Sequence, residues 1–173
     1  RAPSLCQIRA VPKTLSYTDT GFDRAALLRR NDAWTAKRLK DTNTCILPVW
    51  RNLNMIRPGD TPKAVVLKGK TAQKFLEIAS EVALLGINDK TVYFAADVSE
   101  YEPEELKSFS RRAEFIDLRQ TGPVMNSQEA ARLAYARGMM YWHRNHRYCG
   151  VCGSPTENHQ GGHVRVCTGA DCE

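Results

Sequence analysis

Four of the six cysteines lie between residues 148 and 173, and their spacing constrains the fold of this chain more than any other feature. They form two pairs: two residues separate Cys149 from Cys152, and four separate Cys167 from Cys172. A zinc ion takes four such ligands at the corners of a tetrahedron, with each sulfur about 2.3 Å from the metal. Four thiolates complete this coordination, so the spacing predicts a structural zinc site with no open position for catalysis.

The residues between the two cysteine pairs favour a hairpin. Gly161 and Gly162 are suited to a tight turn, and the segment 163–167 alternates like a strand that leads back to the third cysteine. Cysteine pairs joined by such a hairpin are typical of a zinc ribbon. We therefore predict a small zinc ribbon over residues 147–173.

Disulfides are the alternative use of the four cysteines. They are typical of secreted proteins, whereas this sequence shows no apolar core of a secretory signal, so zinc is favoured. His159 and His163 are potential competing ligands, but four cysteines leave them no vacancy, and we interpret both as exposed or strand-face side chains. Cys45 lies in an apolar stretch and is expected to be an inert core thiol.

The first residues and the overall charge give weaker information about location and partners. We interpret residues 1–20 as a flexible basic terminus, with the remnant of an organelle transit sequence as the alternative. Because no secretory signal is seen, we expect an intracellular protein in the cytoplasm, with mitochondria or peroxisomes as the alternatives. No apolar run approaches the roughly 20 residues of a membrane-spanning helix, so no membrane partner is expected. The formal net charge of +6 favours phosphate-bearing partners only weakly.

Helical and β-like patterns mix along the chain without a regular βαβ alternation, which predicts an α+β fold. The apolar runs 82–87 and 91–98 flank a polar turn at 88–90, which predicts a hairpin. Pro48 within the strand-like segment 44–50 indicates an edge strand or a strand end. Further strands are predicted at 64–67 and 114–118, and helices at 22–30, 31–40, 71–80 and 103–113.

A long helix is predicted at residues 127–146, because Asn126 and Glu129 have the spacing of a capping box. Its apolar residues fall on two neighbouring faces. We therefore expect it to be covered on both, to join the first domain to the cysteine module and to contact a second subunit. The helix is also basic; contact with phosphates or RNA is one interpretation, and a solvated helix face is the favoured one. The basic residues are Arg132, Arg137, Arg144, His146 and Arg147.

The segment 131–167 resembles the NADH pyrophosphatase family, the NudC-type Nudix hydrolases. It has an alanine-rich helix that ends in the pair Trp142-His143, followed by an aromatic residue and the glycine-rich cysteine turn at 148–153. The resemblance covers nearly all of the chain from about residue 21 onward. Upstream segments that agree with the family are 23–34, 46–51, 94–99 and 115–123.

The resemblance implies an organisation in four parts. These are the terminus 1–20, a degenerate Nudix-like domain with a mixed or antiparallel sheet and flanking helices at 21–126, a linking helix at 127–146 and the zinc ribbon at 147–173. It also implies a homodimer that hydrolyses NADH to reduced nicotinamide mononucleotide and AMP, and some members remove NAD caps from RNA. The implied cofactor of that reaction is Mg²⁺ or Mn²⁺, held by glutamates of a Nudix box in a catalytic domain.

The chain departs from the family at these catalytic glutamates. A Nudix box needs an Arg-Glu step that leads into a Glu-Glu pair on a helix, whose carboxylates hold the metals. The sequence has no Arg-Glu step, and its one Glu-Glu pair, Glu104-Glu105, follows Pro103 without the surrounding pattern. We therefore assign no catalytic residue. We expect the non-catalytic N-terminal and zinc-ribbon portion of such an enzyme, inactive alone and serving dimerisation and structural support. A stand-alone zinc-ribbon adaptor that binds protein or nucleic acid is the alternative.

Overall fold

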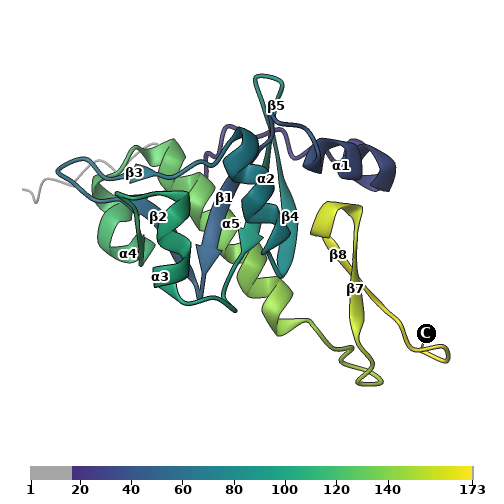
Figure 1. The fold of residues 1–173 in the computed structure, drawn as a ribbon. Coiled ribbons are helices and arrows are strands. Elements are labelled where there is room, and N and C mark those ends of the chain that lie inside the picture. Colours follow the sequence, from purple (N-terminus) through teal and green to yellow (C-terminus); the bar gives the residue numbers. More distant parts are fainter. Residues whose placement is uncertain (1–16, 173) are drawn as a thin grey trace, which may run out of the picture.

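The computed structural model describes residues 17–172 and shows an α+β fold in two parts (Figure 1). The larger part is built on a six-stranded sheet in the order β3-β2-β1-β5-β4, with β6 paired to β2. The smaller part is the two-stranded sheet of β7 and β8. The predicted fold class is confirmed, whereas residues 1–16 of the predicted flexible terminus lie outside the described residues.

Most elements follow the sequence prediction, with exceptions at the helix expected at 22–30, the second half of the helix expected at 103–113 and the strand expected at 64–67, of which only Ala64 lies in β3. The strands are β1 (Cys45–Trp50), β2 (Leu53–Arg57), β3 (Lys63–Ala64), β4 (Glu81–Asn88), β5 (Thr91–Asp97), β6 (Glu114–Ile116), β7 (Thr156–His159) and β8 (Val164–Cys167). The α-helices are α1 (Asp32–Leu39), α2 (Gly69–Glu77), α3 (Pro103–Leu106), α4 (Leu118–Thr121) and α5 (Ser127–Asn145). The strand β2 and the helix α4 were not predicted. The sheet is mixed, because β1 runs parallel to β5 while β4 runs antiparallel to β5.

Both faces of the larger sheet are buried under helices. Ile46 of β1 contributes to the cluster that contains Phe75 of α2. Its neighbour Leu47 contributes to the opposite cluster, which contains Leu133 of α5. Figure 1 shows α2 in front of the sheet and α5 behind it. Since side chains of both faces are buried, β1, β4 and β5 read in the sequence as continuous apolar runs.

The predicted hairpin of β4 and β5 is confirmed. Asp89 and Lys90 at its turn have φ angles of 45° and 68°, as a type I′ turn requires. At Gly86 of β4, an added Cβ would lie 2.4 Å from the carbonyl oxygen of Asp23. The glycine thus allows Asp23 to pair with Ile87 through two backbone hydrogen bonds of 2.9 and 2.7 Å. The segment before α1 therefore covers part of the outer edge of β4.

The prediction of a helix over 22–30 is wrong, because the backbone of Asp23 is bonded to β4. Only Leu28–Arg30 form a single 3₁₀ turn. The local apolar spacing is helical, but a tertiary partner takes the backbone groups that a helix would need. The next helix begins as predicted, since the side chain of Asn31 accepts a hydrogen bond of 3.0 Å from the N–H of Trp34.

The prediction that Pro48 marks a sheet edge or a strand end is also wrong, because β1 lies inside the sheet between β2 and β5. The N–H of Ile46 donates to the carbonyl of Leu67 on the β2 side of the strand. Pro48, two residues later, directs its nitrogen to the same side. Residue pairing between β1 and β2 begins only at Val49. The N–H that Pro48 lacks therefore falls where β1 has no paired residue in β2.

Helix α5 begins as predicted and ties the sheet to the ribbon. The side chain of Asn126 accepts hydrogen bonds of 3.0 and 3.1 Å from the N–H groups of Gln128 and Glu129. The carboxylate of Glu129 does not close the capping box; it accepts from the N–H of Ala64 at 3.0 Å and so fixes β3 to the helix. Across the described range 17–172, no helix combines the length and apolar character needed to cross a membrane.

Candidate metal centre and its junction with the domain

The four predicted cysteines meet at one end of the β7–β8 hairpin. The Sγ atoms of Cys149, Cys152, Cys167 and Cys172 all lie within 4.8 Å of one another. The sulfurs of Cys149 and Cys172 are 3.6 Å apart, and those of Cys152 and Cys167 are 3.4 Å apart. Tetrahedral zinc with bonds of about 2.3 Å separates its sulfurs by roughly 3.8 Å, whereas a disulfide bond is about 2.05 Å long. The arrangement of the thiols therefore fits a metal better than two disulfides.

Each cysteine pair presents a backbone N–H group to a sulfur. The N–H of Val151 donates to Cys149 Sγ at 3.4 Å, and the N–H of Gly169 donates to Cys167 Sγ at 3.3 Å. Each donor stands two residues after its cysteine, and such bonds favour the thiolate form. Gly169 is also a packing requirement, because an added Cβ there would lie 3.2 Å from Cys152 Sγ.

The four thiols differ in how readily they ionise. Hydrogen bonds from Ser154 lower the pKa of Cys152 to about 6. Hydrogen bonding to the sulfurs of Cys152 and Cys149 raises the pKa of Cys172 to about 12. Four sulfurs this close cannot all carry negative charge unless a cation compensates for it. A soft divalent ion such as zinc would supply that charge and bind thiolates.

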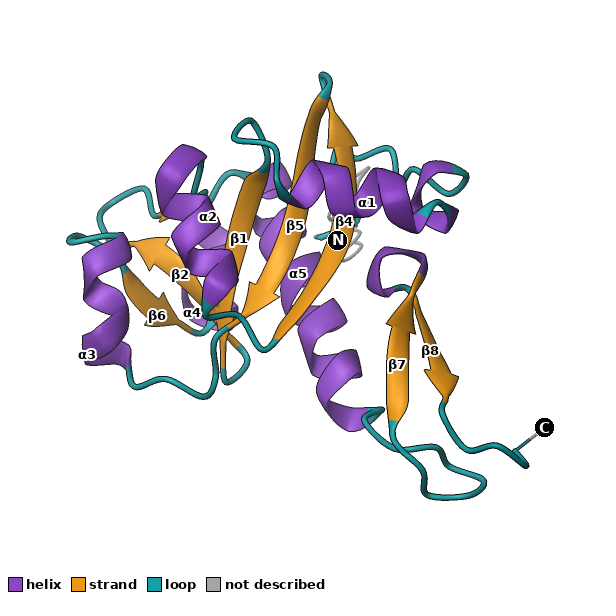
Figure 2. Cartoon of the chain, turned by 45° about the vertical axis from the view of Figure 1, so that its right-hand side comes forward, coloured by secondary structure: helices purple, strands orange, loops and turns teal. Residues whose placement is uncertain are grey.

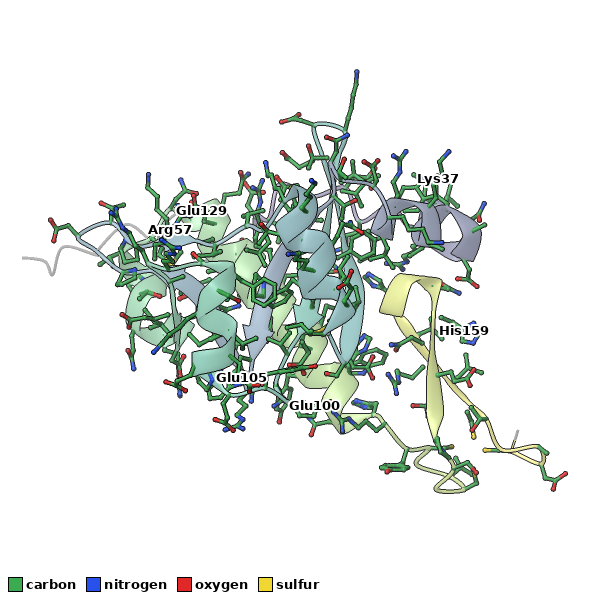
Figure 3. The ribbon with its side chains drawn as sticks, in the orientation of Figure 1. Lys37, Arg57, Glu100, Glu105, Glu129 and His159 are labelled. Carbon is green, nitrogen blue, oxygen red and sulfur yellow. The ribbon has the colours of Figure 1, made fainter. Side chains whose placement is uncertain are left out.

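The two histidines of the ribbon lie outside the cysteine cluster. His159 is exposed on the outer side of β7, away from the domain (Figure 3). His163 is half-buried: its Nε2 donates to the carbonyl of Leu84 at 2.7 Å, and its Nδ1 accepts from Arg29 at 3.0 Å. Burial lowers the pKa of His163, which favours the neutral ring that these two bonds require. The prediction holds for His159, whereas His163 helps to dock the ribbon on β4.

One carboxylate, that of Glu81 at the start of β4, joins the ribbon to the domain. Its Oε2 is 3.1 Å from His143 Nδ1 of α5 and accepts from Asn158 of β7 at 2.5 Å. Its Oε1 accepts from Arg165 Nη1 of β8 at 3.0 Å. The side chain of Glu81 is 16% exposed, so this group, here called the Glu81 junction, brings four elements together largely away from water. Figure 2 shows the ribbon hairpin beside β4 and the end of α5.

The bonds of His143 indicate that its ring is charged. The side chain is fully buried, and its Nε2 lies 2.7 Å from the carbonyl oxygen of Gly162, which can only accept. Burial raises the pKa of Glu81, but hydrogen bonds from His143, Asn158 and Arg165 outweigh burial and lower it to about 2. The carboxylate is therefore ionised at neutral pH and also only accepts. Both ring nitrogens then donate, which makes His143 an imidazolium paired with Glu81.

We expect the Glu81 junction to weaken in acid. The pKa of Glu81 is 4.5 ordinarily and about 2 in the fold, so the pairing stabilises the fold above pH 4.5. That stability is lost as the pH falls from 4.5 to 2, by about 3 kcal/mol in all. Urea unfolding of the wild type and Glu81→Gln should therefore show a stability difference that shrinks over this range. Acid also releases the metal, but this release should affect both proteins alike. A stability difference between the two proteins that does not change with pH would contradict the expectation.

The basic residues of α5 are largely tethered within the chain. Arg132 donates to the backbone carbonyl of residue 20 at 2.7 Å, and Arg144 donates to the side chain of Asn52 at 2.6 Å. Arg137 pairs with Asp117 at 3.3 Å. These bonds fix the helix to neighbouring loops, a role that neither interpretation of the basic face included.

Glu81, Asn158 and Arg165 were not candidates from the sequence. Glu81 directly precedes the apolar run 82–87 and reads as a solvated strand end. The one available signal was His143, a polar residue within an otherwise apolar helix face, which suggests a buried partner without identifying it.

Fold and centre together define a class of protein: a Nudix-like domain that carries a docked zinc ribbon. Residues 43–142 match the sequence model of the NADH pyrophosphatase-like rudimentary NUDIX domain, and residues 144–173 match that of the NADH pyrophosphatase zinc ribbon domain. The chain belongs to the NADH pyrophosphatase family, and the resemblance inferred from the sequence is confirmed. The finer bounds at 21–126, 127–146 and 147–173 stay predictions.

Two relatives illustrate the family. The chain is 29% identical over 100 residues to the "NAD-capped RNA hydrolase NUDT12" of Macaca fascicularis, which covers 57% of this chain and 22% of the relative. It is 28% identical over 109 residues to the "NAD(P)H pyrophosphatase NUDT13, mitochondrial" of Mus musculus, covering 58% of this chain and 31% of the relative. The matched part is thus less than a third of each curated relative, whose name describes the longer protein.

Proposed function

We propose that this chain is the non-catalytic N-terminal and zinc-ribbon portion of an NAD(H) pyrophosphatase and that it serves as its structural support. The Glu81 junction carries the proposal, because α5, β7 and β8 all bond to one largely buried carboxylate of β4. A satisfied buried network of this kind favours a single arrangement of the parts it joins. The domain and ribbon would then offer one rigid base to a catalytic Nudix domain that is not among these residues.

The acidic side chains support a non-catalytic role. Glu105 of the only Glu-Glu pair accepts from the N–H of Glu102 at 2.9 Å, and Glu104 pairs with Lys107 at 3.5 Å. Within residues 17–172, the cysteine cluster is the one group of three or more potential metal ligands. Metal-assisted hydrolysis of a pyrophosphate needs carboxylates that hold Mg²⁺ or Mn²⁺. We place those carboxylates in the catalytic domain.

The ribbon would depend on zinc for its stability. Cys149, Cys152, Cys167 and Cys172 are the proposed ligands, and four sulfurs would close the coordination sphere. Between residues 147 and 172, Gly162 is the only fully buried residue, so this segment has no apolar core of its own. When bound, the metal would supply the cross-links that hold the two cysteine turns together.

Substrate, assembly and location are proposed from the family. The names of the two relatives support a dinucleotide such as NADH or NAD as substrate, with NAD-capped RNA as a further one. A homodimer is proposed as the assembly, and Tyr148 and Val151, 68% and 82% exposed on the ribbon, offer apolar surface for it. We retain the cytoplasm as the proposed location.

A stand-alone zinc-ribbon adaptor is the second candidate. The same exposed side chains, Tyr148 and Val151, favour it, because an adaptor would present such a surface to a protein or nucleic acid. The continuation of the reading frame past Glu173 separates the two candidates. A following Nudix box supports the enzyme, and a stop codon at that point supports the adaptor.

Incubation with NADH tests the proposed function. The 173-residue chain with Mg²⁺ or Mn²⁺ should release no AMP, because its described residues, 17–172, hold no carboxylate cluster for the metal. The same chain extended through a following Nudix box should release AMP and reduced nicotinamide mononucleotide, both separable by chromatography. The control is the extended protein with the Glu-Glu pair of its box changed to glutamine. Turnover by the 173-residue chain would overturn the proposal.

A further inference from the structure

A cavity of about 520 Å³ opens beside α5, and neither the zinc ribbon nor the proposed support role uses it. Its volume lies within the roughly 300–1,000 Å³ of small-molecule sites. None of its lining residues belongs to the cysteine cluster or to the Glu81 junction. Helix α5 contributes residues at the spacing i, i+3, i+4 and i+7, which is one helix face. The lining residues are Ala134, Arg137, Gly138 and Tyr141 of α5, with Tyr17, Asn52, Leu118 and Arg119.

Gly138 lines the cavity without adding a side chain to it. A Cβ added there would meet no atom within 4 Å, so no close packing requires a glycine. Gly138 also lies inside α5, without the left-handed φ that favours glycine elsewhere in the chain. A glycine inside a helix is less favourable than alanine. Its effect at this position is to leave space on the helix face.

The cavity carries net positive charge. Asp117 accepts from Arg119 Nε at 2.9 Å and pairs with Arg137 Nη1 at 3.3 Å. One carboxylate is thus shared by two guanidinium groups, which leaves one positive charge in excess. A guanidinium has five N–H donors in a fork suited to phosphate oxygens. The side chain of Arg119 is 81% exposed and that of Arg137 is 30% exposed, so both reach solvent at this site.

Two aromatic rings and an amide complete the lining. Tyr17 and Tyr141 are 40% and 55% exposed, and both line the cavity. Partly exposed tyrosine rings provide faces on which a planar base can stack. The oxygen of the Asn52 side chain accepts from Arg144 at 2.6 Å, which leaves its NH₂ group to donate.

We infer that this cavity binds a nucleoside monophosphate, with the base stacked on a tyrosine and the phosphate held by Arg119 and Arg137. The combination of aromatic faces, two guanidinium groups and an amide matches the three parts of that ligand better than a simple anion or an apolar molecule. The ligand is either a free nucleotide or one nucleotide unit of an RNA. The inference does not depend on the proposed support role.

Calorimetric titration of the 173-residue protein with AMP tests the inference. AMP should bind, while adenosine and inorganic phosphate should each bind at least about tenfold more weakly, because each lacks one of the two recognised parts. Titration with a 5′-phosphorylated RNA tetranucleotide of adenine distinguishes the two forms of the ligand. Tighter binding than AMP would identify a nucleotide unit of RNA as the ligand, and equal or weaker binding would identify the free nucleotide. Phosphate binding as tight as that of AMP would contradict base stacking.

Two variants and a matched control locate the binding. Gly138→Leu should place a side chain in the cavity and weaken AMP binding by at least about tenfold without lowering the thermal midpoint, since leucine is a better helix former than glycine. Arg137→Gln should weaken binding by about tenfold and reduce its salt dependence. Lys37→Gln removes the same charge from α1, far from α4 (Figures 1 and 3), and should leave binding unchanged. The inference is overturned if the wild type does not bind AMP at millimolar concentration, or if both cavity variants bind it as the wild type does.

Discussion

A Cys152→Ser variant is expected to lose tight zinc binding and to unfold the cysteine turns at 149–153 and 167–172, while the sheet domain stays folded. Structural zinc contributes an apparent free energy of about 10–16 kcal/mol in isolated zinc-finger peptides. The described part of the ribbon, residues 147–172, has no buried apolar core to replace it. The hairpin tip is bonded to the domain through His143 and His163, so it should lose protection later than the turns.

Limited proteolysis and hydrogen exchange measure this effect. In the variant, cleavage sites should appear first in the two cysteine turns, and exchange in β1 and β5 should remain slow. Cys45→Ala is the control, because it also removes a thiol, but one that is fully buried in the sheet. That variant should keep one zinc per chain. A Cys152→Ser protein with full zinc content and a protease-resistant ribbon would contradict the proposed ligand set.

A Glu81→Ala variant is expected to release the ribbon from the domain and to destabilise the fold by about 3–5 kcal/mol. The reason is that the buried His143 imidazolium and the Arg165 guanidinium, 0% and 8% exposed, would lose their shared partner. Removing one member of a buried ion pair costs more than the pair contributes, because the remaining charge stays out of water.

Urea unfolding and hydrogen exchange in β7 and β8 measure the change. Glu77→Ala is the matched control: it removes the same carboxylate from an exposed position on α2 and should change stability by less than about 0.5 kcal/mol. The combined variant Glu81→Ala with Arg165→Ala should lose less than the sum of the two single changes. Equal stabilities of wild type and Glu81→Ala would show that the junction does not hold the ribbon.

Local signals explain what the sequence could predict. The cysteine spacing, the Asp89-Lys90 turn and the caps at Asn31 and Asn126 depend on residues close together in the chain, and the structure has each of them. The family resemblance rests on similar local segments. The sequence could predict that the four cysteines lie together, because one short hairpin joins the two cysteine pairs.

Two of the features that were missed depend on partners far away in the chain. The segment 22–30 has helical spacing, but Asp23 bonds to β4, and no local pattern indicates that. The Glu81 junction joins residues 62 and 84 positions apart, so it requires the folded arrangement of α5, β4 and β8. The prediction for Pro48 was wrong because the effect of a proline on a strand depends on which backbone hydrogen bonds the neighbouring strands make with it.

X-ray absorption at the zinc K-edge, combined with elemental analysis of the purified protein, examines the four-thiolate centre directly. We expect one zinc per chain, bound by four sulfurs at about 2.3 Å and by no oxygen or nitrogen. A protein that folds without metal, sulfurs joined as disulfides, or a zinc with a nitrogen or water ligand in place of one sulfur would contradict a closed structural site.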